Sequence, residues 1–578
     1  MEHKDLKKRY SKIDSHRGAV ILIVLLAIVL LSFSAYVFAE LMLVESVVSS
    51  TFAQETQARS AAESGVEYVA AILNDRRSSG HVDLYNNPEL FQNVPISGVL
   101  NSHQPPGQPT FCVVAPFQGN SPQLRFGLVD ESKRFNLNCL PLHKRQSILA
   151  RKRLLSIDKM TPQIADAILD WLDEDDEPRE FGAEQSYYQS LNPPVNCRNS
   201  RIDLLSDLLQ VRGVTAELLY GEDTNHDGWL DATENDGAET FPVDNSDGVL
   251  SQGWSAELTT FGGKSNYGPD GFQKIDLNQP SLAKLYDELA AEFDENIARF
   301  VIAYRMEGPI DSEDFPDEYA DSDYGNSDYG NSDYGNSDYG NDEFGNDEFG
   351  NDDYELADAQ RRTAEQTNES ADDIRALFNL ANQNRGGIDL TIEPSYRVRS
   401  LYDLFGSAVR LLIDNKDTIL DSPWSADPST IASRIPLLDQ KLDTDNGNDL
   451  APFVNVNQSS LDVLMTVPGM DREVAKMIIA ARPISGTAIP ESRRSSTAWL
   501  LTEGIINLQQ LRRIAPYITV RGDVFRVDVV GFAGGANSPV SRVSAILDAT
   551  YQPVRIIHFR DLPVLSSNSR RFFTYREE

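Results

Sequence analysis

One uninterrupted apolar run near the N-terminus constrains this chain more than any other feature. Residues 19–39 (AVILIVLLAIVLLSFSAYVFA) contain no charged side chain, and about 20 apolar residues suffice to cross a bilayer as a helix. A basic leader precedes the run, with cations at Lys4, Lys7, Lys8, Arg9, Lys12 and Arg17. The pattern predicts a single transmembrane helix at residues 19–39. Its basic end lies in the cytoplasm and the bulk of the chain lies outside the inner membrane, in the periplasm.

The position of the candidate cleavage site is unusual for an exported protein. In a secretory signal, a small-residue cleavage site follows the apolar segment. Here the candidate bond joins Gly18 and Ala19 and precedes that segment. Cleavage would remove the charged leader and keep the helix, a layout similar to type IV prepilins, whose new N-terminus is methylated. The alternative is an uncleaved signal anchor.

Length and charge bound the remaining possibilities. The chain has 578 residues and a net charge of −36, which predicts several domains. An acidic ectodomain repels phosphate backbones and attracts divalent cations. The three cysteines have no zinc spacing; two of them can pair in an oxidising periplasm, or all can be small buried residues. They are Cys112, Cys139 and Cys197.

The periodicity predicts an α+β fold in which a long N-terminal helix packs on a small antiparallel sheet, as in pilins. Residues 53–73 continue the helix without proline, and β-rich runs appear at 111–117, 124–130, 524–533, 542–551 and 554–562. We expect these runs to form one sheet, with residues 136–516 inserted into it. The predicted units are 1–18 (leader), 19–39 (transmembrane helix), 40–75 (helix extension), 76–135 (first part of the sheet), 136–310 (helical), 311–375 (linker), 376–516 (helical), 517–565 (second part of the sheet) and 566–578 (tail).

The inserted region contains a repeat. A hydrophobic-Asn/Asp-hydrophobic-Asn tetrad occurs at 135–138, 275–278 and 454–457, and each tetrad precedes a helix, a turn and a second helix. We interpret these as SAM-like or helix-hairpin-helix units in which the Asn or Asp caps the helix that follows. Between two of them, residues 311–355 repeat SDYGN and DEFGN. This composition is too poor in apolar residues to fold and predicts an acidic linker.

Residues 223–234 (DTNHDGWLDATE) match a calcium loop of the EF-hand type. The ligand pattern is Asp223, Asn225, Asp227, the Trp229 carbonyl, Asp231 and Glu234, with Gly228 at the sharp turn and Leu230 as the apolar anchor. The spacing offers a hard cation six or more oxygens, so a structural calcium ion is predicted. A polar turn without metal is the alternative.

Other acidic stretches are weaker. Asp244, Ser246, Asp247 and Gly248 resemble part of a loop, as do Asp443, Asp445, Asn446, Asn448 and Asp449; solvated turns are the simpler interpretation. Residues 170–178 (DWLDEDDEP) suggest a solvated helix end or a cation site ahead of a hydrolase carboxylate pair. The sequence shows no P-loop, GxSxG or HExxH pattern, and we predict that the protein is not an enzyme.

Residues 464–479 (LMTVPGMDREVAKMII) resemble a helix-hairpin-helix. DNA-binding versions direct backbone N–H groups at a phosphate. Gly469 is present, but Asp471 stands at the second glycine position, where its carboxylate would repel a phosphate. We therefore expect a protein contact or a structural unit and no nucleic-acid binding.

Several stretches together resemble general secretion pathway protein K, the large minor pseudopilin of type II secretion systems. They are IADAILDWLDEDDEPREFGAEQSYYQSLNPP (164–194), LLSDLLQVRGVT (204–215), FGLVDESKRFNLN (126–138), FVNVNQSSLDVLMTVPGM (453–470) and YITVRGDVFRVDVVGFA (517–533), followed by VRIIHFRDL. The pentapeptide repeat and the calcium loop depart from that pattern.

The resemblance implies a role at the tip of a pseudopilus. Most pilin-like proteins carry Glu at the fifth mature position, where it neutralises the N-terminal amine of the next subunit. Cleavage after Gly18 would place Ile23 there, so no subunit pairs above this one. The implied partners are the minor pseudopilins I, J and H, the major pseudopilin, the prepilin peptidase, the inner-membrane assembly platform, and possible contacts with the secretin and secreted substrate. A calcium-dependent membrane-anchored binding protein and a competence-type DNA receptor are the competing hypotheses.

Overall fold

A computed structural model describes residues 5–75, 82–96, 108–116, 124–142, 147–226, 228–310, 384–413, 416–444, 453–482, 490, 493, 495–534 and 539–563, with only the backbone described at residues 5–19. The predicted linker at 311–375 and the tail at 566–578 lie outside these ranges. The α-helices are α1 (Asp5–Asn74), α3 (Pro88–Phe91), α4 (Ser147–Leu154), α5 (Pro162–Leu172), α6 (Gln185–Gln189), α7 (Ala216–Tyr220), α8 (Leu282–Glu292), α9 (Glu295–Glu307), α11 (Pro428–Leu438), α12 (Leu461–Met465), α13 (Arg472–Ala481), α15 (Trp499–Thr502) and α16 (Leu508–Ile514). Short 3-10 helices are η1 (Glu131–Lys133), η2 (Leu137–Cys139), η3 (Leu205–Gln210), η4 (Ala232–Glu234), η5 (Gly253–Ala256), η7 (Leu401–Leu404) and η8 (Ala515–Tyr517).

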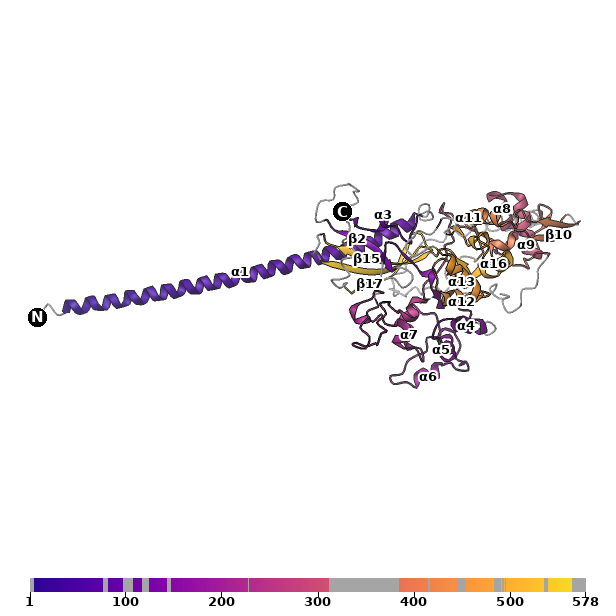
Figure 1. The fold of residues 1–578 in the computed structure, drawn as a ribbon. Coiled ribbons are helices and arrows are strands. Elements are labelled where there is room, and N and C mark those ends of the chain that lie inside the picture. Colours follow the sequence, from indigo (N-terminus) through magenta and orange to yellow (C-terminus); the bar gives the residue numbers. More distant parts are fainter. Residues whose placement is uncertain are drawn as a thin grey trace, which may run out of the picture.

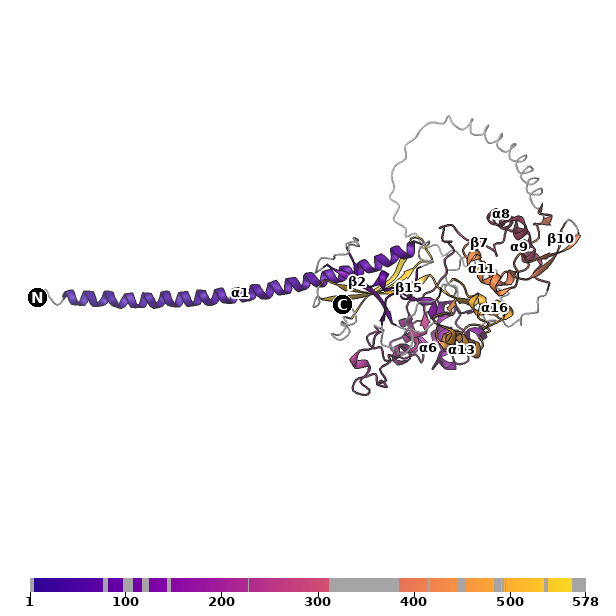
Figure 2. The same cartoon turned by 45° about the horizontal axis from the view of Figure 1, so that its top comes forward.

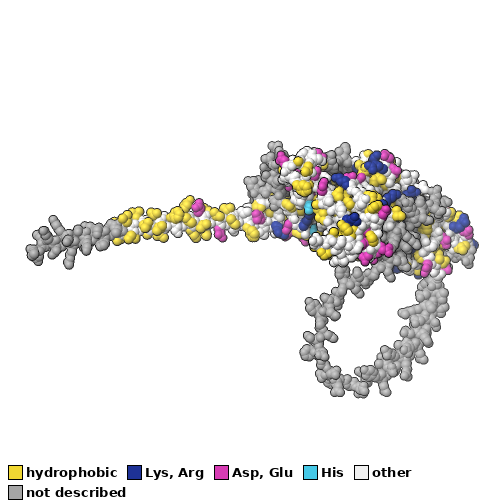
Figure 3. Space-filling view, turned by 90° about the horizontal axis from the view of Figure 1, so that it is seen from below, with side chains coloured by type: hydrophobic (Ala, Val, Ile, Leu, Met, Phe, Trp, Pro, Cys, Tyr) yellow, Lys and Arg dark blue, Asp and Glu magenta, His cyan; other side chains and the backbone are white. Residues whose placement is uncertain are grey.

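Helix α1 is a single rod whose first half projects from the rest of the molecule (Figure 1). The apolar side chains of residues 20–48 are exposed along this half of the helix (Figure 3). This stretch is long and apolar enough to cross a membrane. The second half becomes buried from Ala58 onward. One helix therefore combines a segment suited to lipid with a segment that packs on protein.

The sheet that receives α1 is antiparallel and is built from the two ends of the chain. Its strand order is β1-β2-β15-β16-β17, with β3 paired to β2 and β4 paired to β15. The strands are β1 (Val94–Pro95), β2 (Thr110–Pro116), β3 (Leu124–Arg125), β4 (Val129–Asp130), β15 (Val524–Phe532), β16 (Val540–Asp548) and β17 (Arg555–Leu562). The expected α+β class, with a long apolar helix and an antiparallel sheet, is confirmed.

Small residues let α1 lie directly on the sheet. A Cβ atom on Gly531 of β15 would lie 2.1 Å from the Ala58 carbonyl oxygen and 2.5 Å from the Ala62 nitrogen. One on Gly65 of α1 would meet Val529 at 2.5 Å. Since helix backbone cannot retreat as a side chain can, Gly531 is required by this close approach. Val66, Val69 and Leu73 fill the interface with the strands.

The insert is held together by three matching tetrads, each of which starts with a two-residue parallel strand pair. The pairs are β5 (Phe135–Asn136) with β6 (Leu258–Thr259), β7 (Ile275–Asp276) with β12 (Leu442–Asp443), and β13 (Val454–Asn455) with β14 (Ile518–Thr519). Two hairpins complete the strands: β8 (Asn384–Arg385) with β9 (Ile388–Asp389), and β10 (Ala408–Ile413) with β11 (Lys416–Asp421).

The tetrad side chains differ in part from the prediction. The first Asn or Asp accepts the N–H two residues on, at 3.0 Å in Asn136 and 2.8 Å in Asp276. This caps only the three-residue η2 in the first unit. The longer helices are capped by other residues, which are Thr161 (α5), Ser281 (α8), Asp294 (α9), Ser460 (α12) and Asp471 (α13). The capping hypothesis was therefore wrong for these helices, because residues separate each tetrad from them.

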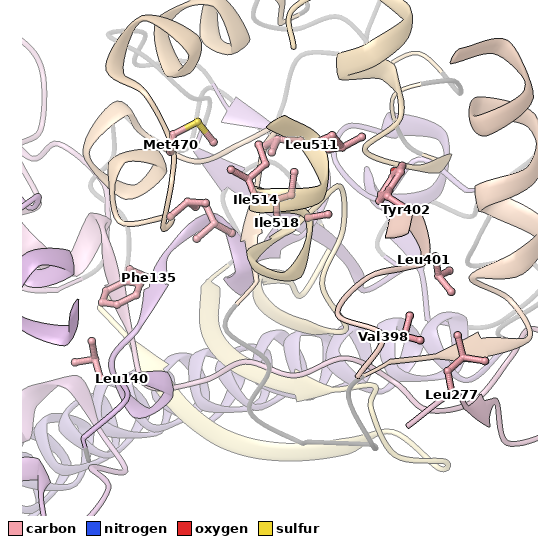
Figure 4. Close-up of a cluster of buried hydrophobic side chains, with 14 of the residues drawn as sticks. Phe135, Leu140, Leu277, Val398, Leu401, Tyr402, Met470, Leu511, Ile514 and Ile518 are labelled. Carbon is pink, nitrogen blue, oxygen red and sulfur yellow. The ribbon is translucent and has the colours of Figure 1, made fainter. Parts of the chain in front are cut away.

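The last Asn of the first two tetrads acts as a clamp between distant segments, whereas, among the described residues, the Asn457 side chain of the third donates only to the Arg493 carbonyl, at 2.8 Å. Asn278 donates to the carbonyls of Val398 and Thr444 at 2.8 and 2.7 Å and accepts the Val398 N–H at 2.9 Å. Asn138 does the same with Ile202 and Thr260. The clamps lie beside one continuous core that runs through all three units, part of which is drawn in Figure 4.

A buried charge cluster joins the sheet to the insert. Glu131 of η1 is fully buried, and its carboxylate accepts from Arg134 at 2.7 Å, from Arg526 of β15 at 3.1 Å and from the Thr259 hydroxyl of β6 at 2.6 Å. Burial by itself would raise the pKa of Glu131, but the two guanidinium groups and the hydroxyl lower it to about 2. The insert lies beyond the sheet, at the end of the molecule opposite the bare part of α1 (Figures 1 and 2).

Candidate metal centre

The predicted calcium loop folds back on itself through its own ligand side chains. Asp223 Oδ2 accepts the Gly228 N–H at 3.0 Å, and Gly228 has a φ of +75° that suits glycine. Glu234 accepts the Thr224 N–H at 2.9 Å with one oxygen and the Asp231 N–H at 3.0 Å with the other. Asn225 donates to Asp231 at 3.0 Å. These contacts join the third, ninth and twelfth positions of the loop, and join the first position to Gly228 at the sixth, whereas Asp227 lies outside the described residues.

The loop also contacts the sheet, which the sequence did not predict. Trp229 packs against the cluster of Cys112, Val114, Val530 and Val540, and the Arg542 guanidinium lies 4.5 Å from its ring centroid. Arg560 of β17 donates to the His226 carbonyl at 2.7 Å. Because Val113 and Val529 point to α1 and their neighbours point away, the loop lies on the opposite face of the sheet from the helix.

A second group of carboxylates lies between α5 and α6. Oxygens of Asp173, Asp175 and Glu184 lie within 4.8 Å of one another. Asp173 and Glu184 are buried, at 6% and 2% exposure. The second oxygen of each accepts a hydrogen bond, from Arg179 and from the Gln185 N–H, and the Cys197 thiol also interacts with Glu184. Within the described part of the chain, Asp173 Oδ1 and Glu184 Oε1 have no nitrogen or oxygen donor, and buried carboxylate oxygens in that state are costly. The donor set consists of hard oxygens, which fits Ca²⁺ or Mg²⁺.

The carboxylates of this cluster carry more negative charge than Arg179 neutralises. Burial, together with repulsion from Asp170 and Asp173, raises the pKa of Glu184 to about 7. Burial likewise raises the pKa of Asp173 to about 6, against the effect of Arg179. Arg179 is the cation within the cluster: its Nη1 lies 2.6 Å from Asp170 Oδ1 and 2.5 Å from Asp173 Oδ2.

Comparison of the three units shows that the carboxylate of Asp170 is particular to the first unit. The second helices read IADAILDWL (164–172), IARFVIAYR (297–305) and VAKMIIAAR (474–482). Asp170 thus stands where the other units have Ala303 and Ala480. Arg305 and Arg482 donate to the tetrad carbonyls of Asn278 and Val456, at 3.1 and 2.8 Å, whereas the first unit has Leu172 at that position.

The sequence pointed to part of this group. Residues 170–178 were expected to form a solvated helix end or a cation site, and the solvated helix end is wrong for Asp170 and Asp173, which are buried. Glu184 was missed. The burial of Asp170 and Asp173 could have been predicted from their spacing with Asp166. This spacing places the three carboxylates on one face of α5 and its C-terminal cap, among residues that are otherwise apolar and buried.

The remaining predicted positions are more ordinary. Asp244 accepts the N–H groups of Asp236, Gly237 and Ser246, as in a polar turn. Asp443 is buried in β12, and residues 445–450 lie outside the described part. Gly18 and Ala19 lie in α1, where only their backbone is described, and Ile23 is exposed on the same helix.

The hairpin of α12 and α13 presents a carboxylate where a DNA-binding version presents backbone N–H groups. Asp471 accepts the Glu473 N–H at 2.7 Å, and a Cβ on Gly469 would lie 2.8 Å from Arg513. None of the three cysteines is in a disulfide; Cys112 and Cys139 are buried, which raises the pKa of each thiol to about 12.

Parts of the chain are similar to known type II secretion system proteins. Residues 133–220 match the family model described as type II secretion system (T2SS), protein K. An Escherichia coli (strain K12) protein named as a candidate type II secretion system protein K is 41% identical over 58 residues, which are 10% of this chain and 18% of that protein. The crystal structure of the GspK-GspI-GspJ complex from enterotoxigenic E. coli aligns over 88% of this chain and 98% of that chain, at 10% identity and a TM-score of 0.28. A TM-score this low does not define a shared fold.

Proposed function

We propose a function for this chain from one premise: it carries a type II secretion system protein K domain at residues 133–220. The family match and the E. coli relative confirm the resemblance stated above. We infer that the chain is a non-catalytic minor pseudopilin at the tip of the pseudopilus. There it would initiate pseudopilus assembly and support the secretion of folded proteins across the outer membrane.

The observation that carries this proposal is the difference between the two halves of α1. Its apolar first half is bare, and its second half is buried on the sheet from Ala58 onward. A subunit of this shape can leave the membrane if the exposed apolar half of its α1 packs against the corresponding helix segments of other subunits. The insert lies at the opposite end of the molecule (Figure 1), where its bulk would prevent another subunit from adding on top.

The identity of residue 23 supports the tip position. A free N-terminal amine inside a membrane is costly unless a carboxylate neutralises it. If processing follows Gly18, Ile23 offers no carboxylate to a subunit above. The chain would then accept subunits only below itself, in agreement with a role at the start of assembly.

The proposed partners follow from the family resemblance. They are the minor pseudopilins I, J and H, the major pseudopilin, the prepilin peptidase and the inner-membrane assembly platform, together with contacts to the secretin and the secreted substrate. The insert would lie in the periplasm. The two competing hypotheses, an anchored calcium-dependent binding protein and a DNA receptor, gain no support from the comparisons.

We also propose that the insert binds calcium at two places. In the loop at 223–234 the ligands would be Asp223, Asn225, Asp227, the Trp229 carbonyl, Asp231 and Glu234. Between α5 and α6 they would be Asp173, Asp175 and Glu184, supported by the unpartnered buried oxygens there. Calcium would neutralise acidic side chains and stabilise the insert; no chemical step depends on it.

N-terminal sequencing of the mature protein, purified from cells with the prepilin peptidase, tests the first step. A methylated start at Ala19 supports the proposal, whereas a start at Met1 refutes processing. Ile23→Glu then tests the tip position, with Ile23→Leu as its control. The Glu variant should impair assembly or secretion in a strain that lacks the wild-type gene. Normal secretion by that variant would contradict the argument from residue 23.

A further inference from the structure

We infer that Arg179 is a resident counter-ion of the carboxylate cluster between α5 and α6, and that it sets how strongly this site responds to calcium. The inference rests on the cation site proposed above for Asp173, Asp175 and Glu184. It assigns Arg179 the role of a positioning residue: it would act through Asp173 and would not bind the cation itself.

The contacts divide the two oxygens of Asp173 between different tasks. Arg179 Nη1 donates to Oδ2 at 2.5 Å, while Oδ1 is buried and has no hydrogen-bond partner. The same Nη1 donates to Asp170 Oδ1 at 2.6 Å. A charge-assisted bond of this kind is short and directional. Arg179 therefore fixes the orientation of Asp173 and leaves one oxygen free for a cation.

The backbone N–H of Arg179, like its side chain, is hydrogen-bonded to Asp170. The Arg179 N–H lies 3.2 Å from Asp170 Oδ2, so the chain after α5 turns back onto that helix. Gly182 continues this path: a Cβ there would lie 1.8 Å from Asp170 Oδ2. The same short segment then brings Glu184 to the cluster. Arg179 is thus fixed between α5 and the segment that supplies the third carboxylate.

The charges predict how the site behaves without calcium. Among the described residues, Arg179 is the cation paired with Asp170 and Asp173, and carboxylate oxygens of Asp175 and Glu184 lie close to Asp173. In the calcium-free protein, Arg179 is the charge that offsets the buried Asp170 and Asp173. When calcium is bound, the ion takes over part of that task. Loss of Arg179 should therefore destabilise the calcium-free state more than the calcium-bound state.

The experiment compares thermal unfolding of the full-length protein in detergent, in EDTA and in CaCl₂. Arg179→Gln removes the charge, and Arg179→Lys keeps it. Arg151→Gln is the matched control. Arg151 of α4 pairs at 2.5 Å with Asp166 of α5, which lies outside the cluster. We expect the calcium-induced rise in Tm to be about twofold larger in Arg179→Gln than in wild type. It should be close to wild type in Arg179→Lys and Arg151→Gln.

Two outcomes separate failure of this inference from failure of the proposed site. An equal loss of Tm with and without calcium in Arg179→Gln overturns the role of Arg179. Calorimetric calcium titration tests the site itself: a Glu184→Gln variant with the wild-type stoichiometry overturns the site. If Arg179→Gln does not fold in EDTA, folding in calcium supports the inference and failure in both conditions overturns it.

Discussion

Glu131 and Arg526 form an ion pair across 395 residues of sequence, with Arg526 Nε at 3.1 Å from Glu131 Oε1. Glu131 directly follows β4, and Arg526 lies in β15. The ion pair therefore joins the chain just before the insert to the chain just after it. The carboxylate is fully buried and also holds Arg134. Through Arg526 of β15 and the Thr259 hydroxyl of β6, this carboxylate links the sheet to the insert.

Glu131→Gln should therefore be strongly destabilising, by about 3–5 kcal/mol, because it leaves two guanidinium groups without their buried carboxylate. Urea denaturation of the full-length protein in detergent measures the loss. Arg59→Gln is the control, since its pair with Asp561 is exposed on both sides and its loss should cost much less stability. Similar losses in the two variants would contradict the role given to Glu131.

The Glu131 pair also predicts behaviour in acid. The pKa of Glu131 is about 2 in the folded state, below its ordinary value of 4.5. A depressed pKa contributes stability that is complete above the unfolded value and is lost as the pH falls toward 2. Wild-type Tm should therefore fall between pH 4.5 and 2 more steeply than the Tm of Glu131→Gln. Parallel profiles would refute the assignment.

Glu257 should show the opposite dependence on pH. Burial, together with repulsion from Asp462 and Asp158, raises its pKa to about 7. A carboxyl with a raised pKa contributes stability below its unfolded value, and this contribution is lost as the pH rises through 7. Glu257→Gln should be more stable than wild type at pH 8, by about 1–3 kcal/mol, and similar at pH 4.5. A constant difference across this range would argue against the prediction.

Asn278→Ala should cost roughly 3 kcal/mol, because it leaves the Val398 N–H and the carbonyls of Val398 and Thr444 without their shared partner. Urea denaturation measures this as well. Asn296→Ala is the control, because that side chain is exposed near the start of α9. If both variants unfold at the same urea concentration, the tetrad asparagine is not a clamp.

Glu234→Gln should reduce the number of calcium ions bound by one, since Glu234 closes the loop with both of its oxygens. Isothermal titration calorimetry on EDTA-treated protein counts the ions. Glu217→Gln, on the exposed side of α7, should bind as wild type does. Chelation should also lower the Tm of the wild type; an unchanged transition with and without chelator would exclude a stabilising calcium ion.

Several elements could be predicted because their signals are local. The apolar run at 19–39 and the proline-free stretch after it predicted α1, and alternating apolar residues predicted β2, β15, β16 and β17. The tetrads were visible as repeats, but their function was not. A short Asn-containing motif looks like a helix cap in sequence, whereas the carbonyls that Asn278 binds belong to residues 398 and 444.

The candidate site shows the same limit. Spacing alone led to the prediction of a calcium loop at 223–234, because all the expected ligands lie within one short stretch of chain. Glu184 gave no such signal: it joins Asp173 only because the chain folds back over α5 past Gly182. Trp229 was expected only to offer a carbonyl, and its ring instead attaches the loop to the sheet.

By itself, the sequence determined the apolar helix, the strands at the two ends of the chain, the repeats between them and the family resemblance, since each depends on residues close together. Only the tertiary structure decided which buried groups meet. Glu131 meets Arg526, Asp173 meets Glu184, and Gly531 meets the backbone of α1 because packing brings these segments into contact. Pairing of buried charges depends on distances of a few ångströms between remote segments, and no local pattern encodes those distances.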